Sequence, residues 1–269
     1  MSHLIGRLSK AATTCTAVVA FSVAAGLASL PSAKADEAQA KDLFKAMSDY
    51  LGAQTMISFD YDSSLEMVTK QDQKVAFTSS GNVTLNRPDK LRATRKGGFA
   101  NVELVFDGKT ASLLGKDKNV YTQAEIPGSI DHLVDELRSK YHRPLPAADL
   151  LMADAYKQIM PLVTNVKDLG SGFIRGEECD HIALRTKQVD LQLWIHQGDQ
   201  PYPCRYQLTT TKVKGWPEYT IDVRNWKTGS DVAASDFSFT PPAGAKMMKP
   251  GKLPSLDELP RELVKGIPQ

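Results

Sequence analysis

The chain has 269 residues, of which 42% are hydrophobic and 24% are charged, and its formal net charge is +2 at pH 7. Three of the positive charges, Arg7, Lys10 and Lys34, precede the first acidic residue at position 36, so the remainder carries +2 minus 3, or −1. A near-neutral surface without clusters of Lys and Arg lacks the electrostatic footprint that binds phosphate backbones, and we exclude nucleic acid as a partner.

The N-terminal segment has the organisation of a secretory signal peptide. Arg7 and Lys10 precede a stretch of apolar and small residues at 17–30, and Ala33-Lys34-Ala35 fits an Ala-x-Ala cleavage site. We predict a cleaved leader at 1–35, a single domain at 36–245, a proline-rich tail at 246–269 and a periplasmic location. The alternative is an uncleaved membrane anchor, because residues 11–30 are almost long enough to span a bilayer.

The spacing of apolar residues predicts three helices. The first covers residues 37–51, the second begins at 130 behind Ser129 as N-cap, and the third covers 147–159 and ends near Pro161. Their apolar faces are expected to include Leu43, Phe44, Met47, Tyr50 and Leu51 in the first helix, and Ile130, Leu133, Val134 and Leu137 in the second.

A period of two dominates the rest of the chain. It begins at Ile57 and continues to Met67, where Asp60, Asp62 and Glu66 alternate with apolar residues and are expected to form a solvated outer face. Similar alternation recurs at 75–77, 83–85, 91–93, 102–106, 191–195, 206–208 and 219–223, and turn signals separate these segments at 87–89, 97–98, 107–108, 170–172 and 198–201. The pattern predicts an antiparallel meander.

A sheet of seven or more long strands has to curl. If helices cover one face of an open, curled sheet, they can enclose an apolar space that the protein's own side chains do not fill. We expect a ligand to lie against the apolar strand faces; the alternative is a filled core. The residues expected to form the cavity wall are Phe59, Tyr61, Leu65, Phe77, Leu191, Leu193, Tyr206 and Ile221.

Two cysteines follow the leader, Cys179 and Cys204. An oxidising compartment favours a disulfide between them. The expected strands oppose it, because one strand lies between the two cysteines and separates them by about 9.6 Å unless that strand ends early or twists away. The sequence leaves both alternatives open.

The sequence Cys179-Asp180-His181 suggests catalytic or metal chemistry at first sight. On a strand, however, Asp180 points away from Cys179 and His181, so it does not orient the histidine, and no other orienting group is evident. His132, His142, His181 and His196 lie on different expected elements, without the close ligand pairs of zinc sites. Because the chain also lacks phosphate-loop, dinucleotide and nucleophile-elbow motifs, we expect no catalytic residue, metal or cofactor.

Three segments carry a family resemblance: CDHIALR at 179–185, DLQLWI at 190–195 followed by Pro203, and DFSFTPPAG at 236–244. They resemble a family of predicted periplasmic proteins of unknown function (domain of unknown function 2092), whose members are similar to the LolA/LolB lipoprotein carriers. The resemblance covers about residues 37–245. It implies an α+β fold in which an unclosed antiparallel half-barrel has helices over its concave face and an apolar interior that receives acyl chains in the carriers.

These observations favour a periplasmic protein that is not an enzyme and that carries or senses a lipid, an acyl chain or another hydrophobic small molecule. The main alternative is an interaction protein of the cell envelope with a filled core, whose outer surface or tail docks a membrane protein. An enzyme is the third hypothesis, and no recognisable constellation of residues supports it.

Overall fold

The computed structural model describes residues 33–141, 145 and 148–249, all of which belong to one compact unit, Ser32–Gln269. Residues 1–32 of the expected leader, His142 and most of the expected tail therefore lie outside the described residues. The helices and short 3-10 turns are α1 (Ala33–Ala53), α2 (Ile130–Ser139), α3 (Ala155–Ile159), η1 (Ala148–Leu151), η2 (Met160–Leu162) and η3 (Gly229–Asp231). Among the described residues, none of these helices is both long and apolar enough to cross a bilayer.

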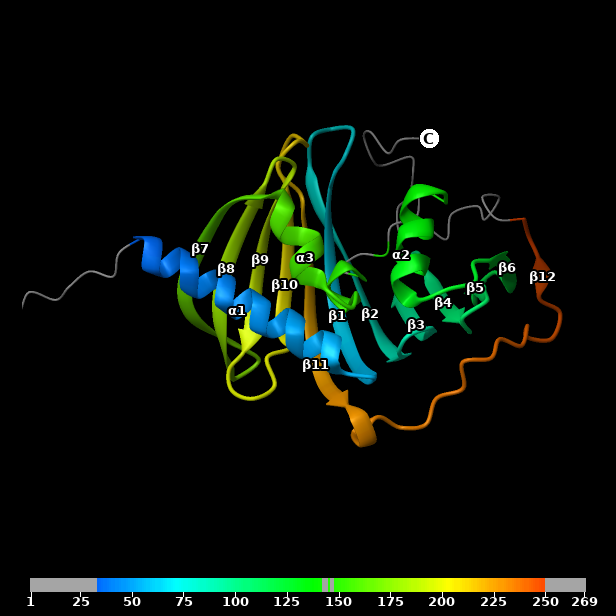
Figure 1. Ribbon diagram of the computed structural model, residues 1–269. Helices are drawn as coiled ribbons and strands as arrows, with labels where there is room; N and C mark the ends of the chain where they lie inside the picture. The colour runs from blue at the N-terminus through cyan, green and yellow to red at the C-terminus, as the bar shows by residue number, and fades with distance from the viewer. Residues whose placement is uncertain (1–32, 142–144, 146–147, 250–269) are drawn as a thin grey trace, which may run out of the picture. The chain divides into compact units, whose positions relative to one another are not determined.

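Twelve strands of the described chain form a single sheet (Figure 1). Their bounds are β1 (Met56–Val68), β2 (Lys74–Asn86), β3 (Lys90–Gly97), β4 (Asn101–Phe106), β5 (Thr110–Gly115), β6 (Val120–Glu125), β7 (Val163–Ile174), β8 (Glu177–Thr186), β9 (Val189–His196), β10 (Pro203–Thr210), β11 (Glu218–Thr228) and β12 (Lys246–Met247). The predicted α+β class with a largely antiparallel sheet is confirmed.

The strand order is β12-β6-β5-β4-β3-β2-β1-β11-β10-β9-β8-β7, which is not one continuous meander. Strands β1 to β6 form one meander, and the helical segment after β6 takes the chain to the opposite edge, where β7 starts a second meander that returns to the centre. The two halves join where β11 pairs with β1. The sheet is unclosed, with β7 and β12 at its edges.

The predicted turn at residues 170–172 is wrong. The structure places these residues inside β7, where the register with β8 shifts between Asp168 and Ser171. Gly170 has a φ of +79° at this irregularity. A glycine-rich stretch in a strand marks a bulge as readily as a turn, because glycine supplies the positive φ that both need.

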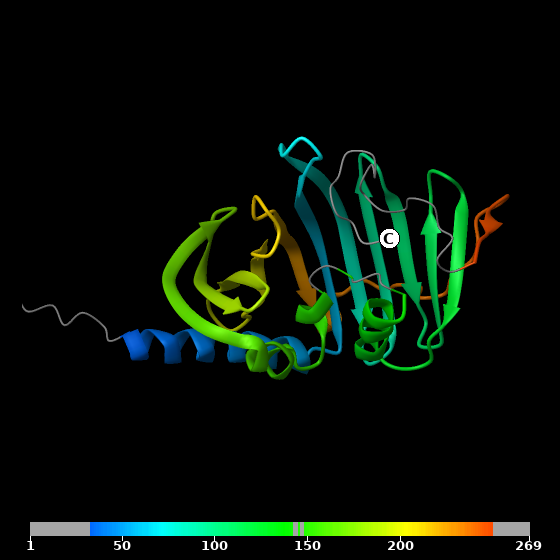
Figure 2. The same cartoon turned by 90° about the horizontal axis from the view of Figure 1, so that it is seen from above.

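Helix α1 buries one stripe against the sheet. Ala40, Phe44, Met47 and Leu51 are spaced by four, three and four residues, and all are fully buried. They belong to the same core as the apolar residues of the sheet, and α1 lies against β7 and β8. Figure 2 shows α1, α2 and α3 on the same side of the sheet.

The predicted N-cap of α2 is confirmed, since the Ser129 side chain accepts a hydrogen bond from the His132 amide at 3.2 Å. The single helix predicted for 147–159 is wrong in its described part: η1 and α3 are separate. Asp154 causes the break, because its backbone is non-helical at φ −144° and ψ 73° and its side chain accepts a hydrogen bond from the Lys157 amide at 3.0 Å, which caps a new helix.

An ion pair between distant strands shows that the sheet is curled. Arg175, in the turn between β7 and β8, places Nη1 3.3 Å from Oδ2 of Asp62 in β1. In the strand order β1 and β8 are four spacings apart, about 19 Å in a flat sheet. Two side chains do not bridge that distance, so the β7–β8 end of the sheet bends back toward β1.

The segment after β11 crosses to the opposite edge of the sheet and holds it by hydrogen bonds to strands and turns. The Asp236 carbonyl accepts a hydrogen bond from Arg92, and the ring of Phe239 lies 5.5 Å from that of Tyr121. The Ala243 carbonyl accepts a hydrogen bond from Asn119 Nδ2 at 3.1 Å, and β12 then pairs in parallel with β6. The DFSFTPPAG motif is therefore a strap over the β3–β6 end.

Candidate functional site

All eight predicted wall residues share one face of the sheet. Phe59, Tyr61 and Leu65 alternate along β1, and the cross-strand pairs carry the face to the neighbouring strands. The pairs are Leu65 with Phe77, Tyr206 with Ile221 and with Leu193, and Leu191 with Leu208. The structure thus brings the predicted residues onto one face of the sheet.

Different parts of this apolar face are covered to different degrees. Phe59, Leu191, Leu193, Tyr206 and Ile221 belong to the buried core, together with the apolar stripe of α1. Tyr61 is partly buried against that core. Leu65 and Phe77 are half-buried and lie outside it, near the end of the sheet that carries the β1–β2 turn. The open part of the face is therefore this end.

A buried polar pair marks the boundary between the covered and open parts. Ser63 and Ser79 are opposite each other in β1 and β2, and their hydroxyl oxygens are 2.8 Å apart. Each is only 7% exposed. Because the hydroxyls satisfy each other, they remain in an otherwise apolar face without an unpaired polar group.

The open end contains an apolar cleft. The rings of Phe77 and Phe99 meet edge to face with centroids 5.5 Å apart, and Phe99 is 54% exposed. The cleft has a volume of about 220 Å³ and is lined by Ala76, Phe77, Thr78, Gly97, Gly98, Phe99 and Ala100. Phe99 escaped the sequence analysis because it lies in a turn, where no periodicity marks an apolar residue. The neighbouring Gly97-Gly98 marked the turn, and it was the sequence feature that could have directed attention to Phe99.

Two further apolar side chains are exposed at the same end. Val213 and Trp216 lie in the turn between β10 and β11, and Trp216 is 60% exposed. Lys214 of this turn forms an ion pair with Asp72, in the β1–β2 turn, at 3.0 Å. The two turns are therefore adjacent, and exposed apolar residues gather around the tips of neighbouring hairpins.

A larger polar cleft adjoins the apolar one. It has a volume of about 580 Å³ and is lined by Asp62, Ser63, Ser64, Thr78, Ser79, Ser80, Lys96, Gly97, Gly98, Thr220 and Asp222. Thr78, Gly97 and Gly98 line both clefts, so the two spaces meet there. The sequence analysis treated Asp62 as part of a solvated face and gave no reason to expect a cleft.

Asp62 is held in place by several partners. Its carboxylate accepts hydrogen bonds from Ser80 Oγ at 2.6 Å, Arg224 Nε at 3.1 Å and Arg175 Nη1 at 3.3 Å. The Ser80 hydrogen bond and then the Arg224 guanidinium hold the pKa of the Asp62 carboxyl below its usual range. This carboxylate is charged and fixed at the edge of the polar cleft.

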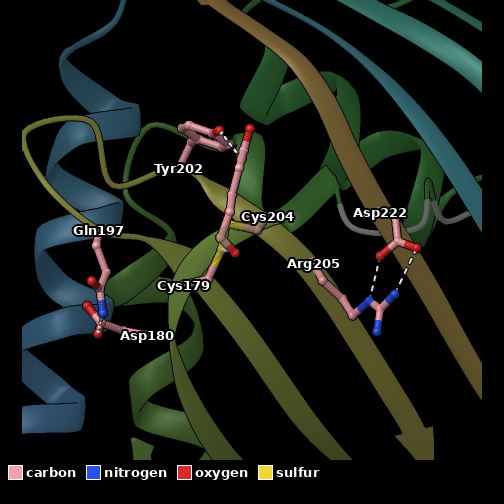
Figure 3. Close-up of a disulfide and its surroundings, with 8 residues drawn as sticks. Cys179, Asp180, Gln197, Tyr202, Cys204, Arg205 and Asp222 are labelled. Atoms are coloured by element: carbon pink, nitrogen blue, oxygen red, sulfur yellow. Dashed lines mark hydrogen bonds and ion pairs between the residues drawn. A yellow bond between two sulfur atoms is a disulfide. The ribbon is translucent and has the colours of Figure 1, made fainter. Parts of the chain in front are cut away.

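Cys179 and Cys204 form a disulfide in the structure, with their Cα atoms 6.8 Å apart (Figure 3). The bridge spans the end of β9, which stops at His196, and Cys204 lies where the register of β10 shifts between Pro203 and Arg205. The middle strand still reaches the cysteines, because its last residue, His196, is the cross-strand partner of Cys179, and the bridge forms where β10 carries its irregularity at Cys204. Both cysteines are buried in the core.

The disulfide removes the nucleophile from the Cys179-Asp180-His181 sequence. Asp180 accepts a hydrogen bond from Gln197 at 2.8 Å, also drawn in Figure 3. His181 stacks on Trp194 with centroids 4.1 Å apart, and burial lowers the pKa of its imidazole. The three adjacent side chains thus have separate partners, and they form no catalytic group in this oxidised state.

A stack of aromatic rings connects this region to α1. Centroids are 4.7 Å apart for His196 and Tyr202, 5.1 Å for Tyr202 and Trp226, and 5.5 Å for Trp226 and Phe59. Trp226 donates a hydrogen bond to the Tyr50 hydroxyl of α1 at 3.3 Å. Burial, and then a hydrogen bond to a neighbouring carboxylate, raises the pKa of the Tyr202 hydroxyl. The stack fixes α1 over the sheet.

Within the described residues, no group of three His, Cys, Asp or Glu side chains could hold a metal ion.

The sequence matches the family model described as "Predicted periplasmic protein (DUF2092)" over residues 40–249. The uncharacterized protein MJ0687 of Methanocaldococcus jannaschii is 27% identical over 166 residues, which cover 61% of this chain and only 43% of that curated relative. Among solved structures, an uncharacterized conserved protein from Thermus thermophilus is 11% identical with a TM-score of 0.43, over 78% of this chain and 99% of that one. LprF from Mycobacterium bovis is 12% identical with a TM-score of 0.44, over 75% and 98%. The family match confirms the predicted periplasmic location, and the chain belongs to the DUF2092 family of predicted periplasmic proteins.

Proposed function

We propose that this protein is a periplasmic binding protein, not an enzyme, that carries or senses a lipid or another hydrophobic ligand. The observation that supports the proposal best is the apolar cleft at Phe77 and Phe99, at the open end of an apolar sheet face. Leu65 and Phe77 are the predicted wall residues outside the buried core, and they belong to this end. The ligand enters here and places its apolar part against the open end of the face.

The size of the cleft limits how much of the ligand it holds. Small-molecule sites commonly have volumes of about 300–1,000 Å³, whereas this cleft has about 220 Å³. It accommodates one segment of an acyl chain, not a whole lipid. Each buried methylene contributes about 0.8 kcal/mol, so a segment of a few methylenes gives weak binding unless the face opens further or the rest of the ligand is also bound.

Native mass spectrometry of protein purified from the periplasm tests the proposal, with titration of a fluorescent fatty acid as the second measurement. A copurified amphiphile or saturable fatty-acid binding is expected. F99D should weaken fatty-acid binding at least about tenfold, because a carboxylate in an apolar cleft must remain solvated or neutralised. F173D is the matched control, since Phe173 of β7 is 70% exposed and does not line the cleft. Protein that is always ligand-free and takes up no fatty acid contradicts the proposal.

One observation favours the alternative of an envelope interaction protein. Five of the eight predicted wall residues already pack in the core with α1, as a filled interior requires. The partner would then be a membrane protein of the envelope, bound by the outer surface or by the tail. Deleting residues 250–269 keeps β12, and a pulldown from envelope extract should then lose that partner if the tail is responsible. An unchanged set of partners excludes residues 250–269.

A further inference from the structure

Four short segments lie side by side at one end of the strands from β7 to β2. They are η2, which leads into β7, and the turns that connect β8 to β9, β10 to β11 and β1 to β2. Thr211 donates two hydrogen bonds to the Gln188 carbonyl, at 3.1 Å from its amide and 2.8 Å from its hydroxyl, and Lys214 binds Asp72. Figure 1 shows the β1–β2 and β10–β11 turns at the top of the view. We call residues 69–73, 160–162, 187–188 and 211–217 the hairpin rim.

The two ends of these strands differ in charge. The hairpin rim has four lysines and one aspartate, a net charge of +3, whereas the turns at the other end have two arginines and three aspartates, a net charge of −1. Those other turns are residues 54–55, 87–89, 175–176, 197–202 and 229–231. Among the described residues, Lys70, Lys187 and Lys212 of the rim form no ion pair. The lysines come from three separate turns, so the fold gathers a positive cluster that the sequence does not show, and its field attracts a negatively charged surface.

Exposed apolar side chains lie among these lysines. Leu162 is 63% exposed, Val213 is 44% exposed and Trp216 is 60% exposed. Trp216 also has a φ of +47°, in a region that bulky residues rarely adopt and that costs free energy. Within the described part of the chain its indole stacks on no other ring, so no such contact offsets this cost. The rim therefore presents apolar side chains to the solvent that the fold itself does not use.

This combination matches the surface of an anionic lipid bilayer. Tryptophan is enriched at the level of lipid headgroups, and clustered lysines are attracted to anionic lipids. Neither of the two clefts includes a residue of the hairpin rim, so the rim meets a partner with protruding side chains, as a bilayer allows, and not with a pocket for an anchoring side chain of a protein.

We infer that the hairpin rim docks the protein on an anionic lipid bilayer. Leu162, Val213 and Trp216 enter the headgroup layer, and the lysines lie against the lipid phosphates. The inference goes beyond the proposed function, because it does not depend on a ligand in the apolar cleft. Docking also turns the open end of the apolar sheet face toward the bilayer, since that end carries the β1–β2 turn.

Co-sedimentation of the mature protein with lipid vesicles tests this inference. One set of vesicles is phosphatidylcholine alone, and the other contains about one third phosphatidylglycerol, an anionic lipid. We expect the protein to bind the anionic vesicles at least about tenfold more tightly, and high salt should weaken this binding because it screens the lysines. The variants K187Q/K212Q and W216A should each weaken it at least about fivefold, the first through charge and the second through the lost interfacial ring.

Two matched controls separate the rim from the rest of the surface. K109Q/K227Q removes the same charge, since Lys109 and Lys227 are exposed and lie outside the rim, in the β4–β5 turn and near the other end of β11. F173A removes an exposed ring from β7, where Phe173 is 70% exposed. Both should bind the anionic vesicles within about twofold of the wild type, and melting curves should show that all variants fold.

Absence of binding to anionic vesicles, equal binding to both kinds of vesicle, or equal losses in the rim and control variants overturns the inference. If the protein ignores vesicles but the rim variants lose a protein partner in a pulldown from envelope extract, the rim is a protein interface instead. Fatty-acid titration without vesicles stays independent: the rim variants should bind as the wild type does, and a failure of the wild type there contradicts the proposed function alone.

Discussion

Asp62 and Arg175 are 113 residues apart in the chain, yet their side chains form an ion pair at 3.3 Å. Asp62 lies in the central strand β1, and Arg175 lies in the turn at the β7 edge of the sheet. Arg224 of β11 also binds Asp62 and extends to Asp60 at 3.4 Å. Charged residues on this face therefore connect the edge of the second meander to the junction of the two halves, where the sheet curls.

Replacing Asp62 by Asn should make the stability of the protein less sensitive to acid. The folded-state pKa of Asp62 is lowered, so its contribution is present above the unfolded pKa of about 3.9 and is lost as the pH falls through the folded pKa. The side chain is 40% exposed, so we expect the loss in D62N at neutral pH to be at most about 1 kcal/mol.

Urea unfolding of wild type and D62N between pH 7 and pH 2 measures this difference. The two stability curves should converge at the acid end. D199N is the control, because Asp199 is exposed in the turn after β9. A gap between wild type and D62N that stays constant down to pH 2 would show that the charge of Asp62 does not stabilise the fold.

Reduction of the Cys179–Cys204 disulfide should lower the melting temperature. The bridge closes a loop with a sequence separation of 25 residues, for which the chain-entropy model gives about 3 kcal/mol. In a domain of this size that corresponds to about 6–12 °C. Calorimetry with and without a reductant measures the shift. Titration of the unfolded, unreduced mature protein should find no free thiol, and two reactive thiols would contradict the bridge.

The sequence predicted those strands that have one buried face and one exposed face. In β9 the burial alternates from Leu191 to Ile195, and the apolar alternation in the sequence corresponds to it directly. Strands β5, β6, β7 and the short β12 were missed. Four of the six residues of β5 are buried, with no alternation, because side chains of both faces are covered. Local periodicity is lost in such a strand.

Local sequence patterns could not predict which distant strands pair with each other. The pairing of β11 with β1 joins residues more than 150 positions apart, as with Tyr61 and Val223, and nothing near either residue specifies it. The sequence left the Cys179–Cys204 disulfide open for the same reason, because whether the two cysteines can meet depends on how β9 lies between them. The predicted wall residues shared a face because they followed from alternation, whereas Phe99 and Trp216 lie in turns and were missed.

Helix α1 should contribute strongly to stability through Phe44. This side chain is fully buried, contacts the ring of Tyr156 at a centroid distance of 5.5 Å and belongs to the core that includes the apolar sheet face. Replacing it with Ala removes a large buried group and leaves a cavity, so F44A should cost about 3–5 kcal/mol. F173A is the matched control and should stay within about 0.5 kcal/mol, since Phe173 is 70% exposed.

Denaturant unfolding of both variants measures these costs. The same F44A protein also probes ligand binding, because a cavity under α1 enlarges the apolar space. If F44A is as stable as F173A, α1 is not packed on the sheet as described.

Gly81 should tolerate no side chain. It lies opposite Tyr61 in β2, and the Tyr61 ring crosses it so that the hydroxyl donates a hydrogen bond to the Thr94 carbonyl of β3 at 3.0 Å. A Cβ at position 81 would lie 2.0 Å from the Thr94 oxygen and 2.8 Å from the Tyr61 ring. The backbone oxygen cannot rotate away, and displacing the ring breaks its hydrogen bond, so we expect G81A to cost about 1–3 kcal/mol.

Gly98 provides the comparison, because a Cβ there meets no atom within 4 Å. G98A should therefore unfold at nearly the wild-type denaturant concentration, although it lies only one residue beyond the end of β3. The double variant Y61A/G81A separates the two obstacles: part of the cost of G81A should disappear in the Y61A background because the ring is gone, and the remainder reports the contact with the Thr94 carbonyl. Equal stabilities of G81A and G98A would mean that the Tyr61 ring does not lie over Gly81, and the apolar face would then lack the ring that covers the sheet between the core and its open end.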